Sequence, residues 1–373
     1  MKYTIAVIPG DGIGPEVTNQ AKKALDAVAE MYDHIFLYKE AQMGACAIDA
    51  VGVPLPEETI AICKRADAIL FGAIGDPKYD NDPEARIRPE QGLLQLRQAL
   101  DLFCNTRPVK AFDSLIKNSP LKREIIIGTD IVIFRELTGG IYFGEKETSK
   151  DGLTAYDISC YTVEEISRIT HIAFKASQSR NKKVTLIDKA NVLETSRLWR
   201  KTVTEIAKQY KDVTLEYLYV DNAAMQLILN PKQFDVILTE NLFGDIISDE
   251  ASVISGSIGL LASSSIGVKN ALFEPIHGSF PAAKGKDIAN PLGSILSVGM
   301  LLEYLGLHEE AGSIERAVEK SLILGITTQD IKGKNKYPAS TSNVGDFIAD
   351  YILNQEDSNL NFMNIHAGQS TII

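Results

Sequence analysis

The stretch that decides the fold is residues 235–250, DVILTENLFGDIISDE. Its first part, Asp235 to Thr239, is an apolar and partly β-branched run that suits a buried strand and is too short for a helix. From Leu242 the apolar residues recur at helical spacing, and Asn241 stands where a cap is expected. A strand that passes directly into a helix is typical of an α/β protein.

Two aspartates on this helix suggest a metal site. Asp245 and Asp249 are four residues apart, so both carboxylates project from one face. They repel each other, and a bound divalent cation such as Mg²⁺, which prefers oxygen ligands, would turn that repulsion into attraction. Acids near a helix start can also merely complement its dipole. The segment alone leaves both interpretations open.

Length and composition are those of a soluble globular protein. The 373 residues suggest about two domains, and 45% hydrophobic with 23% charged residues is ordinary for this class. The net charge of −11 argues against nucleic acid and anionic membrane as partners. An anionic substrate would therefore need a local cluster of basic side chains.

Cysteine usage and the N-terminal sequence predict a cytoplasmic protein. The N-terminus enters a strand without the apolar region of a signal peptide. The longest uncharged run, residues 251–268, holds six serines and three glycines, which indicates a close-packed internal segment rather than a membrane span. Four cysteines lack metal-type spacing, which argues against a disulfide framework: Cys46, Cys63, Cys104 and Cys160.

The glycine-rich turn after the first strand has two interpretations. The strand is expected at Thr4 to Ile8, and residues 10–14 contain three glycines. They invite a dinucleotide-binding fingerprint, but Pro15 interrupts its spacing and no acid follows at the expected place. A tight glycine turn that lines a cleft fits better.

The remaining elements continue the alternation of strands and helices. Strands are expected at residues 34–38, 68–71, 183–188 and 214–219, with two β-like runs within 124–135. Helices are expected at residues 15–31, 57–65, 92–103, 163–179, 194–210, 222–229, 291–305 and 314–324. The other segments are a long loop at 72–88, a hairpin-like arm at 139–157 and a loose tail at 355–373.

Three arginines at element ends point to an anionic substrate. Arg97, Arg107 and Arg135 each lie near the end of a predicted helix or strand. A single arginine is usually a surface residue, but three in an acidic protein are better explained by a substrate with two or more carboxylates, which guanidinium groups bind bidentately.

Further polar residues follow other strands. Lys189 and Asn191 come after the strand at 183–188, and Asp221 follows 214–219. Ligands of open α/β sheets bind at the carboxyl ends of strands, so these side chains and residues 239–245 could converge there. The alternative for Lys189 is a solvated charge. A second small-residue loop, residues 274–291, could approach an adenosine-like group or be structural.

These motifs together resemble the isocitrate/isopropylmalate dehydrogenase family of β-hydroxyacid oxidative decarboxylases. The resemblance runs from Thr4 to about Tyr351 and rests on long, specific motifs. They are IPGDGIGPE (8–16), LLQLR (93–97), RELTGGIYFG (135–144), DKANV (188–192), VDNAAMQ (220–226) and TENLFGDIISD (239–249).

The resemblance implies a two-domain α/β architecture around one continuous central sheet, distinct from the standard Rossmann fold. The first domain would combine residues 1–103 and 256–354, and the second would be residues 104–255. The second domain would form a homodimer interface in which the arm, about 139–157, pairs with its counterpart. The active sites would be shared between subunits.

The resemblance also implies a role for each polar residue. The two malate carboxylates would be bound by Arg97, Arg107 and Arg135. Mg²⁺ or Mn²⁺ would be held by Asp245, Asp249 and the partner subunit's Asp221. Lys189 would take the substrate hydroxyl proton, and Tyr142 would protonate the enol carbon. Lys189, Asn191 and Asp221 would reach the site of the opposite subunit.

An NAD cofactor is implied as well. Its contacts would be Ile13, Glu90, Glu274, His277, Gly278, Ser279, Ala289 and Asn290. NAD-using relatives often have an acid shortly after the His-Gly-Ser-x-Pro sequence, whereas this chain has Ala282. The Lys-Tyr pair of NADP-using relatives is also missing, so NAD remains the expectation and the ribose must be bound differently.

The expected substrate within the family is (2R,3S)-3-isopropylmalate, converted to 2-oxoisocaproate in leucine biosynthesis. Leu93, Leu94 and Val192 would meet the variable group of the substrate, and an unpaired third carboxylate there would cost several kcal/mol. Tartrate/malate, homoisocitrate or isocitrate dehydrogenation is the alternative. From another class, a metal-dependent lyase or a dicarboxylate-binding protein would use the same arginines but would not need the 274–291 loop.

Overall fold

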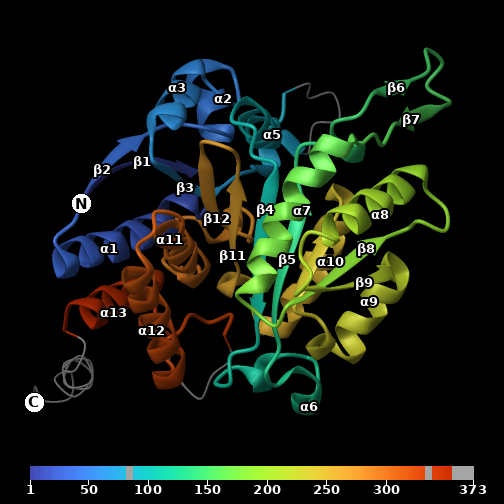
Figure 1. Ribbon diagram of the computed structural model, residues 1–373. Helices are drawn as coiled ribbons and strands as arrows, with labels where there is room; N and C mark the ends of the chain where they lie inside the picture. Colours follow the sequence, from blue (N-terminus) through green and yellow to red (C-terminus); the bar gives the residue numbers. More distant parts are fainter. Residues whose placement is uncertain (81–86, 332–337, 355–373) are drawn as a thin grey trace, which may run out of the picture. The chain divides into compact units, whose positions relative to one another are not determined.

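Figure 1 shows the computed structural model, which describes residues 1–80, 87–331 and 338–354. Two compact units are distinguished by their internal contacts. The first unit contains Met1–Leu96, Ser257–Ser263 and the chain from Asn270 onward, and the second contains Arg97–Gly256 and Ser264–Lys269. The domain boundaries predicted from the sequence stay a prediction. The predicted tail, 355–373, and part of the predicted loop, 81–86, lie outside the described residues.

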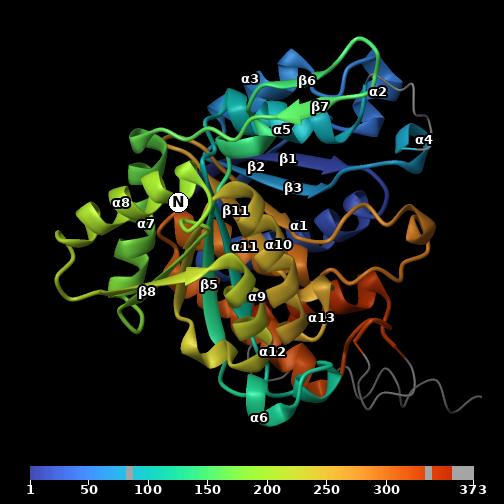
Figure 2. The ribbon, with the colours of Figure 1, turned by 90° about the vertical axis from the view of Figure 1, so that its right-hand side faces the viewer.

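The first unit is built on parallel strands with helices on both faces. Its strands occur in the order β2 (Ile35–Glu40), β1 (Lys2–Gly10), β3 (Ala68–Ala73) and β12 (Ala271–Pro275), and each adjacent pair within β2-β1-β3-β12 is parallel. β3 and β12 are buried along their whole length, as expected for strands covered on both sides. Both ribbon views show α2 and α3 on one side of β1–β3 and α1 on the other (Figures 1 and 2).

The helices α1, α3, α5, α11 and α12 of the first unit lie at or overlap predicted positions, whereas α2, α4 and α13 were not predicted. The N-terminal half contributes α1 (Gly14–Tyr32), α2 (Ala45–Val51), α3 (Glu57–Arg65), α4 (Pro77–Asp80) and α5 (Glu90–Ala99), which continues into the second unit. The C-terminal part contributes α11 (Leu292–Tyr304), α12 (His308–Leu324) and α13 (Thr341–Asn354).

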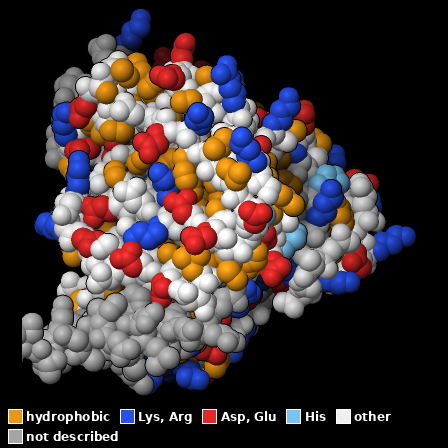
Figure 3. Space-filling view, turned by 90° about the vertical axis from the view of Figure 1, so that its left-hand side faces the viewer, with side chains coloured by type: hydrophobic (Ala, Val, Ile, Leu, Met, Phe, Trp, Pro, Cys, Tyr) orange, Lys and Arg blue, Asp and Glu red, His pale blue; other side chains and the backbone are white. Residues whose placement is uncertain are grey.

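The face in Figure 3 carries basic and acidic side chains interspersed with apolar ones, so it offers no broad basic surface to an anion.

The second unit has a mixed set of strands. Their order is β11 (Ala262–Ile266), β4 (Cys104–Lys110), β5 (Asp130–Glu136), β10 (Val236–Thr239), β8 (Lys183–Asp188) and β9 (Thr214–Tyr219). β4 is antiparallel to β5 and β11, and the others are parallel. Its helices are α6 (Arg123–Ile126), α7 (Val163–Gln178), α8 (Glu194–Ala207), α9 (Val220–Leu229) and α10 (Asn241–Ser252). The strand orders of both units are parts of one ten-stranded mixed sheet, as predicted.

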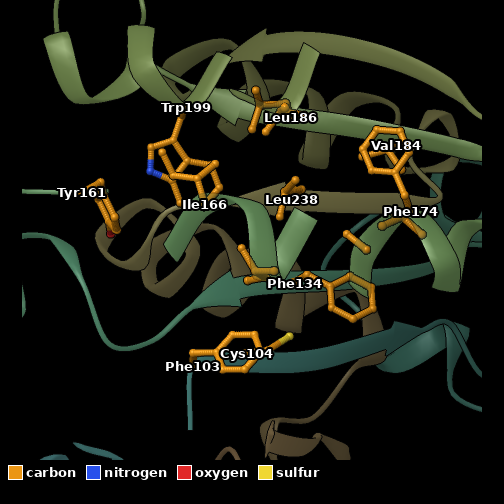
Figure 4. Close-up of a cluster of buried hydrophobic side chains, with 14 residues drawn as sticks. Phe103, Cys104, Phe134, Tyr161, Ile166, Phe174, Val184, Leu186, Trp199 and Leu238 are labelled. Carbon is orange, nitrogen blue, oxygen red and sulfur yellow. The ribbon is translucent and has the colours of Figure 1, made fainter. Parts of the chain in front are cut away.

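Alternation along the central strands gives the second unit two hydrophobic layers. Phe134, Leu186 and Leu238 point to the side of α7 and α8, where Trp199 and Phe174 are fully covered (Figure 4). Their neighbours Ile133, Ile187 and Ile237 belong to the opposite layer with α9 and α10. Because successive strand residues face opposite sides, one set of strands supplies both layers. Truncation of Trp199 to alanine would cost about 3–5 kcal/mol of unfolding free energy.

The predicted arm is a short antiparallel hairpin, β6 (Lys146–Thr148) and β7 (Ala155–Asp157), with every strand residue exposed. A two-stranded hairpin by itself is marginally stable in water, so this one needs something to pack against. Among the described residues, no helix combines the length and apolarity needed to cross a membrane.

Two local expectations from the sequence were wrong, and a third was correct. The first β-like run of residues 124–135 is the short helix α6, because an apolar run of three or four residues does not distinguish strand from helix. Most of residues 251–268 are buried, as predicted, and they finish α10, turn twice and form β11. Asn241 does not cap α10, since Glu240 is the cap residue and its carboxylate accepts a hydrogen bond from the Phe243 N–H.

Candidate active site

Two arginines of the second unit share one face of the sheet. Arg135 lies directly opposite Asn105 in the antiparallel β4–β5 pair, and Arg107 is two residues beyond Asn105 on β4. Opposite residues of such a pair, and residues two apart on a strand, project to the same side. Arg107 is 8% exposed and Arg135 3% exposed. The register of two neighbouring strands therefore places two buried positive charges beneath α10.

The aspartates of α10 are the counter-charges of these arginines. Arg107 donates from Nη1 to Asp249 Oδ1 at 2.9 Å, and its Nη2 lies 3.6 Å from Asp245 Oδ1. Arg135 donates from Nη1 to the same Asp245 oxygen. The two carboxylates differ in access, because the Asp245 side chain is 34% exposed and that of Asp249 is 62% exposed. Both remain open to a ligand on the solvent side.

Burial perturbs the Arg135 guanidinium. The loss of hydration, together with the nearby charges of Arg107 and Arg97, lowers its pKa from 12.5 to about 10, while Asp245 acts in the opposite direction. The group is still charged at neutral pH. Buried cations held next to each other favour any additional anion that can approach them. This electrostatic arrangement suits a substrate with carboxylate groups.

Tyr142 joins the same cluster. It ends the one-turn helix Gly140–Tyr142, and its hydroxyl donates to Asp245 Oδ2 at 2.9 Å. Burial, followed by the hydrogen bond to Asp245 and the charge of that carboxylate, raises the pKa of the phenol. The hydroxyl therefore keeps its proton at neutral pH and can act as a general acid.

Lys189 and Asp221 form a separate pair. Lys189 directly follows β8 and Asp221 lies in the first turn of α9, where the lysine Nζ donates to Asp221 Oδ1 at 2.6 Å. This hydrogen bond lowers the pKa of the aspartate. Asn191 is exposed and Val192 is 59% exposed, so this end of the strand faces outward.

The single chain does not assemble the predicted three-carboxylate metal site. Within residues 1–80, 87–331 and 338–354, no three His, Cys, Asp or Glu side chains are grouped as metal ligands would be. Asp245 and Asp249 lie one turn apart on α10, while Asp221 pairs with Lys189. The assignment of a partner subunit's Asp221 to this site stays a prediction.

The remaining substrate candidates lie on α5. Leu93 and Leu94 are half-buried in the first unit. Arg97 opens the second unit, where its charge contributes to the lowered pKa of Arg135 and its carbonyl accepts the Leu102 N–H at 2.8 Å. Glu90 is the first residue of α5, and a Cβ placed on Gly75 would come within 2.9 Å of its carboxylate.

In the first unit, the glycine turn after β1 docks against the loop that follows β12. Ile13 donates its N–H to the Ser279 carbonyl at 2.8 Å. Gly12 has φ +59°, and a Cβ there would lie 2.0 Å from the same carbonyl oxygen. Only glycine allows this approach. Ile13 packs with Val17, Ala283 and Ala289, so the turn and the loop form one small apolar cluster.

The loop after β12 contains polar atoms that suit a bound heterocycle. His277 Nε2 is buried without a hydrogen-bond partner among the described residues, and burial lowers the pKa of this imidazole, which keeps it neutral. A Cβ on Gly278 would meet nothing within 4 Å. Glu274 is buried in β12, and Asn290 donates to Asp330 at 2.9 Å. Ala282, which stands where NAD-using relatives often have an acid, is exposed.

Sequence reasoning missed several supporting residues. Asp11 accepts from the N–H groups of Ala45, Cys46 and Gly75 at 2.8, 2.9 and 3.0 Å and so fixes the segments around the glycine turn. Asn105 accepts from Arg107 Nε at 2.9 Å. The strand register was the only signal that could have identified Asn105, and a single sequence does not reveal it.

Comparison with known proteins gives a consistent result. The profile described as isocitrate/isopropylmalate dehydrogenase matches residues 4–348. The chain belongs to this family. A 3-isopropylmalate dehydrogenase of Bacteroides fragilis is 53% identical over 352 residues, covering 94% of this chain and 99% of the relative. The enzyme of that name from Wolinella succinogenes is 54% identical, covering 94% and 98%.

Solved structures of the isocitrate/isopropylmalate dehydrogenase family have the same fold. An isocitrate dehydrogenase from Methylococcus capsulatus superposes with a TM-score of 0.84 at 33% identity, covering 94% of this chain and 99% of that one. A β-decarboxylating dehydrogenase from Thermococcus kodakarensis gives 0.78 at 37% identity, covering 95% and 98%. The likeness therefore extends over nearly the whole length of these chains.

Proposed function

We propose that the protein catalyses the oxidative decarboxylation of (2R,3S)-3-isopropylmalate to 2-oxoisocaproate and CO₂, with reduction of NAD, in leucine biosynthesis. The observation that carries the proposal is the cluster at α10, in which two buried arginines, two aspartates and a protonated tyrosine meet. It occurs in a chain more than half identical to relatives named 3-isopropylmalate dehydrogenase.

The substrate carboxylates would bind to Arg107 and Arg135, with Arg97 beside them. Both buried guanidinium groups already form charge-assisted hydrogen bonds with aspartates, and a bound dicarboxylate would add acceptors on the open side. The isopropyl group would meet Leu93, Leu94 and Val192. A third carboxylate there would be desolvated without a counter-charge, at a cost of several kcal/mol, which disfavours isocitrate.

The donor set at α10 fits a hard divalent cation. Asp245 and Asp249 present carboxylate oxygens from one helix face, and these are the ligands that Mg²⁺ and Mn²⁺ prefer. The third carboxylate would be the partner subunit's Asp221. When bound, the metal supplies Lewis-acid stabilisation of negative charge on substrate oxygens.

Proton transfers fall to the two remaining functional groups. Lys189, in its neutral amine form, would accept the proton of the substrate hydroxyl, and Asp221 orients its Nζ through the 2.6 Å hydrogen bond. Bound NAD would supply the hydride acceptor. Tyr142 would deliver its proton to the carbon that loses CO₂. The raised pKa of Tyr142 ensures that this proton is present at neutral pH.

The first unit would hold NAD. The unpartnered His277 Nε2, the open space at Gly278 and the neighbouring Ile13, Ser279, Ala289 and Asn290 suit its adenosine part, while Glu90 and Glu274 would lie toward the nicotinamide side. Ala282 leaves the ribose without its usual acid. Asp287 does not replace that acid as it stands, because its carboxylate accepts from the Ser342 N–H and hydroxyl at 2.8 and 2.6 Å.

A homodimer would complete the site. Exposed apolar side chains lie on α9 and α10, which pack on each other, at the residue that follows α10, and on the arm: Met225, Ile228, Leu229, Ile246, Val253, Leu153 and Tyr156. Large apolar surfaces of this kind are typical of subunit interfaces, and two-fold dimers are the commonest symmetric assembly. The exposed hairpin would gain strands from its counterpart.

The test is a substrate panel. Purified protein with Mg²⁺ and NAD should reduce the cofactor with isopropylmalate, more slowly with smaller alkylmalates, and negligibly with isocitrate. Each omitted methylene should lower kcat/KM by roughly 10- to 200-fold. A greater rate with tartrate, malate or isocitrate would move the substrate within the family, and a preference for NADP would overturn the proposed cofactor. No turnover of any substrate would contradict the proposed function.

A further inference from the structure

Asn241 has a buried amide with three hydrogen bonds to the α10 cluster. It is the first residue of α10 and is 0% exposed. Its Oδ1 accepts from Arg135 Nε at 3.1 Å and from Arg135 Nη2 at 2.8 Å. Its Nδ2 donates to the Gly139 carbonyl at 3.1 Å. One neutral side chain therefore connects the guanidinium group to the turn before Tyr142.

The amide chemistry matters at this position. Arg135 has five N–H donors and is buried, so donors without acceptors would be costly. Asp245 already accepts from Nη1, and a second carboxylate at position 241 would cancel the charge that Arg135 offers to a substrate anion. An amide oxygen satisfies two donors and leaves that charge in place. The amide N–H₂ is equally required, since Gly139 presents a carbonyl oxygen.

The Gly139 turn is the second point of contact. Glu136 Oε2 accepts the Gly139 N–H at 2.7 Å, and Asn241 binds the carbonyl of the same residue. A Cβ on Gly139 would lie 2.7 Å from the ring of Tyr161, so the turn is fitted closely. The one-turn helix that ends at Tyr142 starts at the next residue. The position of the phenol therefore depends on the Gly139 peptide.

We propose that Asn241 is a positioning residue that presents the Arg135 charge to a substrate carboxylate and fixes the turn that carries Tyr142. The proposal rests on the proposed function, because it assumes a dicarboxylate at Arg135 and a proton donated by Tyr142. It assigns Asn241 no contact with the substrate.

Asn241→Asp preserves shape, adds one negative charge beside Arg135 and also removes the Nδ2 donor to the Gly139 carbonyl, so its KM for the substrate reports the first role and its kcat the second. KM for isopropylmalate should rise about 10- to 100-fold, the range expected when a buried charge-assisted contact is weakened, and KM for NAD should be unchanged. Gln233→Glu is the matched control. It makes the same amide-to-carboxylate change at a side chain that donates hydrogen bonds to the Gln226 side chain and the Asn230 carbonyl, and it should leave both KM values unchanged.

Asn241→Ala tests the second role in a double-mutant cycle with Tyr142→Phe. In the presence of Tyr142 it should lower kcat about tenfold, and in the Tyr142→Phe background its effect on kcat should nearly vanish, since the proton donor it positions is already absent. A wild-type KM in Asn241→Asp, or equal loss of kcat by Asn241→Ala in both backgrounds, would overturn the proposal. Melting curves establish that each variant is folded, and if Asn241→Asp is not, the cycle with Asn241→Ala decides.

The two proposals fail differently. If the wild-type protein does not turn over isopropylmalate, the proposed function is wrong. If the wild type turns it over and the Asn241 variants match it, only the role of Asn241 is wrong.

Discussion

The second unit contains two groups of charged side chains that differ in burial and in mutual contact. At α10, Arg107 and Arg135 are almost fully buried and are tied to Asp245, Asp249 and Tyr142 by hydrogen bonds or ion pairs. Lys189 and Asp221 form one ion pair, in which the Lys189 side chain is 25% exposed and the Asp221 side chain is 66% exposed. The first group is organised within one chain, whereas the second faces solvent.

This difference in burial shows which half of the site a single chain can preorganise. A buried guanidinium requires fixed acceptors, so the α10 group must be in place when the chain folds. A partly exposed lysine–aspartate pair contributes little to stability and keeps its groups available for another surface. The asymmetry fits a site completed by a second copy of the chain.

Subunit mixing gives the largest expected effect. Tyr142→Phe and Lys189→Met should each lose roughly 10²- to 10⁴-fold in kcat, the range for removal of a general acid or base. If each site combines Tyr142 with Lys189 of the partner, dissociation and remixing of the two inactive variants should restore about a quarter of wild-type activity, because half of the random dimers contain one intact site.

The control is remixing of each variant with itself, which should restore nothing. If the mixed sample stays inactive although a mixed dimer can be isolated with two affinity tags, both groups act within one chain. That result would remove the basis for the comparison between the two groups.

Arg135→Lys tests the buried group. Lysine keeps the charge but cannot donate to Asn241 and Asp245 in the geometry of a planar fork. We expect kcat/KM for isopropylmalate to fall by about 10²- to 10³-fold, corresponding to roughly 3–4 kcal/mol of transition-state stabilisation. Arg123→Lys on α6 is the control and should have no effect on the steady-state constants. A loss below fivefold would mean that Arg135 is not a main substrate contact.

Much of the fold followed from the sequence because its periodicity was unambiguous. The strands at 183–188 and 214–219 and the helix at 57–65 have the predicted bounds. Long amphipathic helices such as α7 also carry local start signals, here the Thr162–Glu165 capping box. The strands β4, β11 and β12 were missed. β4 and β11 are mixed polar or serine-rich runs that acquire strand structure from their neighbours in the sheet, and β12 is a short apolar run, whose type periodicity alone does not determine.

The residues of the site could be predicted from the sequence, but the hydrogen bonds that hold them could not. Motifs identified Arg107, Arg135, Tyr142, Asp245 and Asp249, which the structure brings together. The supporting contacts of Asn241, Asn105 and Asp11 depend on strand register and loop closure between distant segments. A single sequence contains no signal for these contacts, and Asn241 was mistaken for a helix cap.

Arg200→Lys tests how the strand end that carries Lys189 is held in place. Arg200 donates from Nε and Nη2 to the two oxygens of Asp188, both at 2.8 Å, and its guanidinium lies 5.3 Å from the Tyr219 ring centroid. Lys189 Nζ lies 5.9 Å from the same centroid. Loss of the bidentate fork should loosen the strand end that carries Lys189 and lower kcat about three- to tenfold, with KM nearly constant. Lys201→Arg, an exposed cation on the same helix, should not change kcat.

The smallest expected effect is a change with pH in the free energy of unfolding, and two cysteine variants test it. Cys104 lies on β4, the strand of Arg107, and its burial raises the pKa of the thiol from 9.0 to about 12, whereas Cys160 is exposed. The unfolded chain therefore loses the Cys104 proton at lower pH than the folded protein does. The stabilising contribution is complete below pH 9 and is lost as the pH rises toward 12.

Cys104→Ala should remove this alkaline loss. Near neutral pH it should reduce the free energy of unfolding by about 1 kcal/mol through the cavity it leaves. Above pH 9 the wild type should lose up to about 1.4 kcal/mol per pH unit more than the variant, so the two urea-unfolding curves should converge. Cys160→Ala, which removes an exposed thiol, is the control for the substitution itself. Parallel curves for Cys104→Ala would show that water reaches the α7/α8 layer, on the sheet face opposite Arg107 and Arg135, and the sheet beneath the buried group would then be less closely packed than the exposures of its side chains indicate.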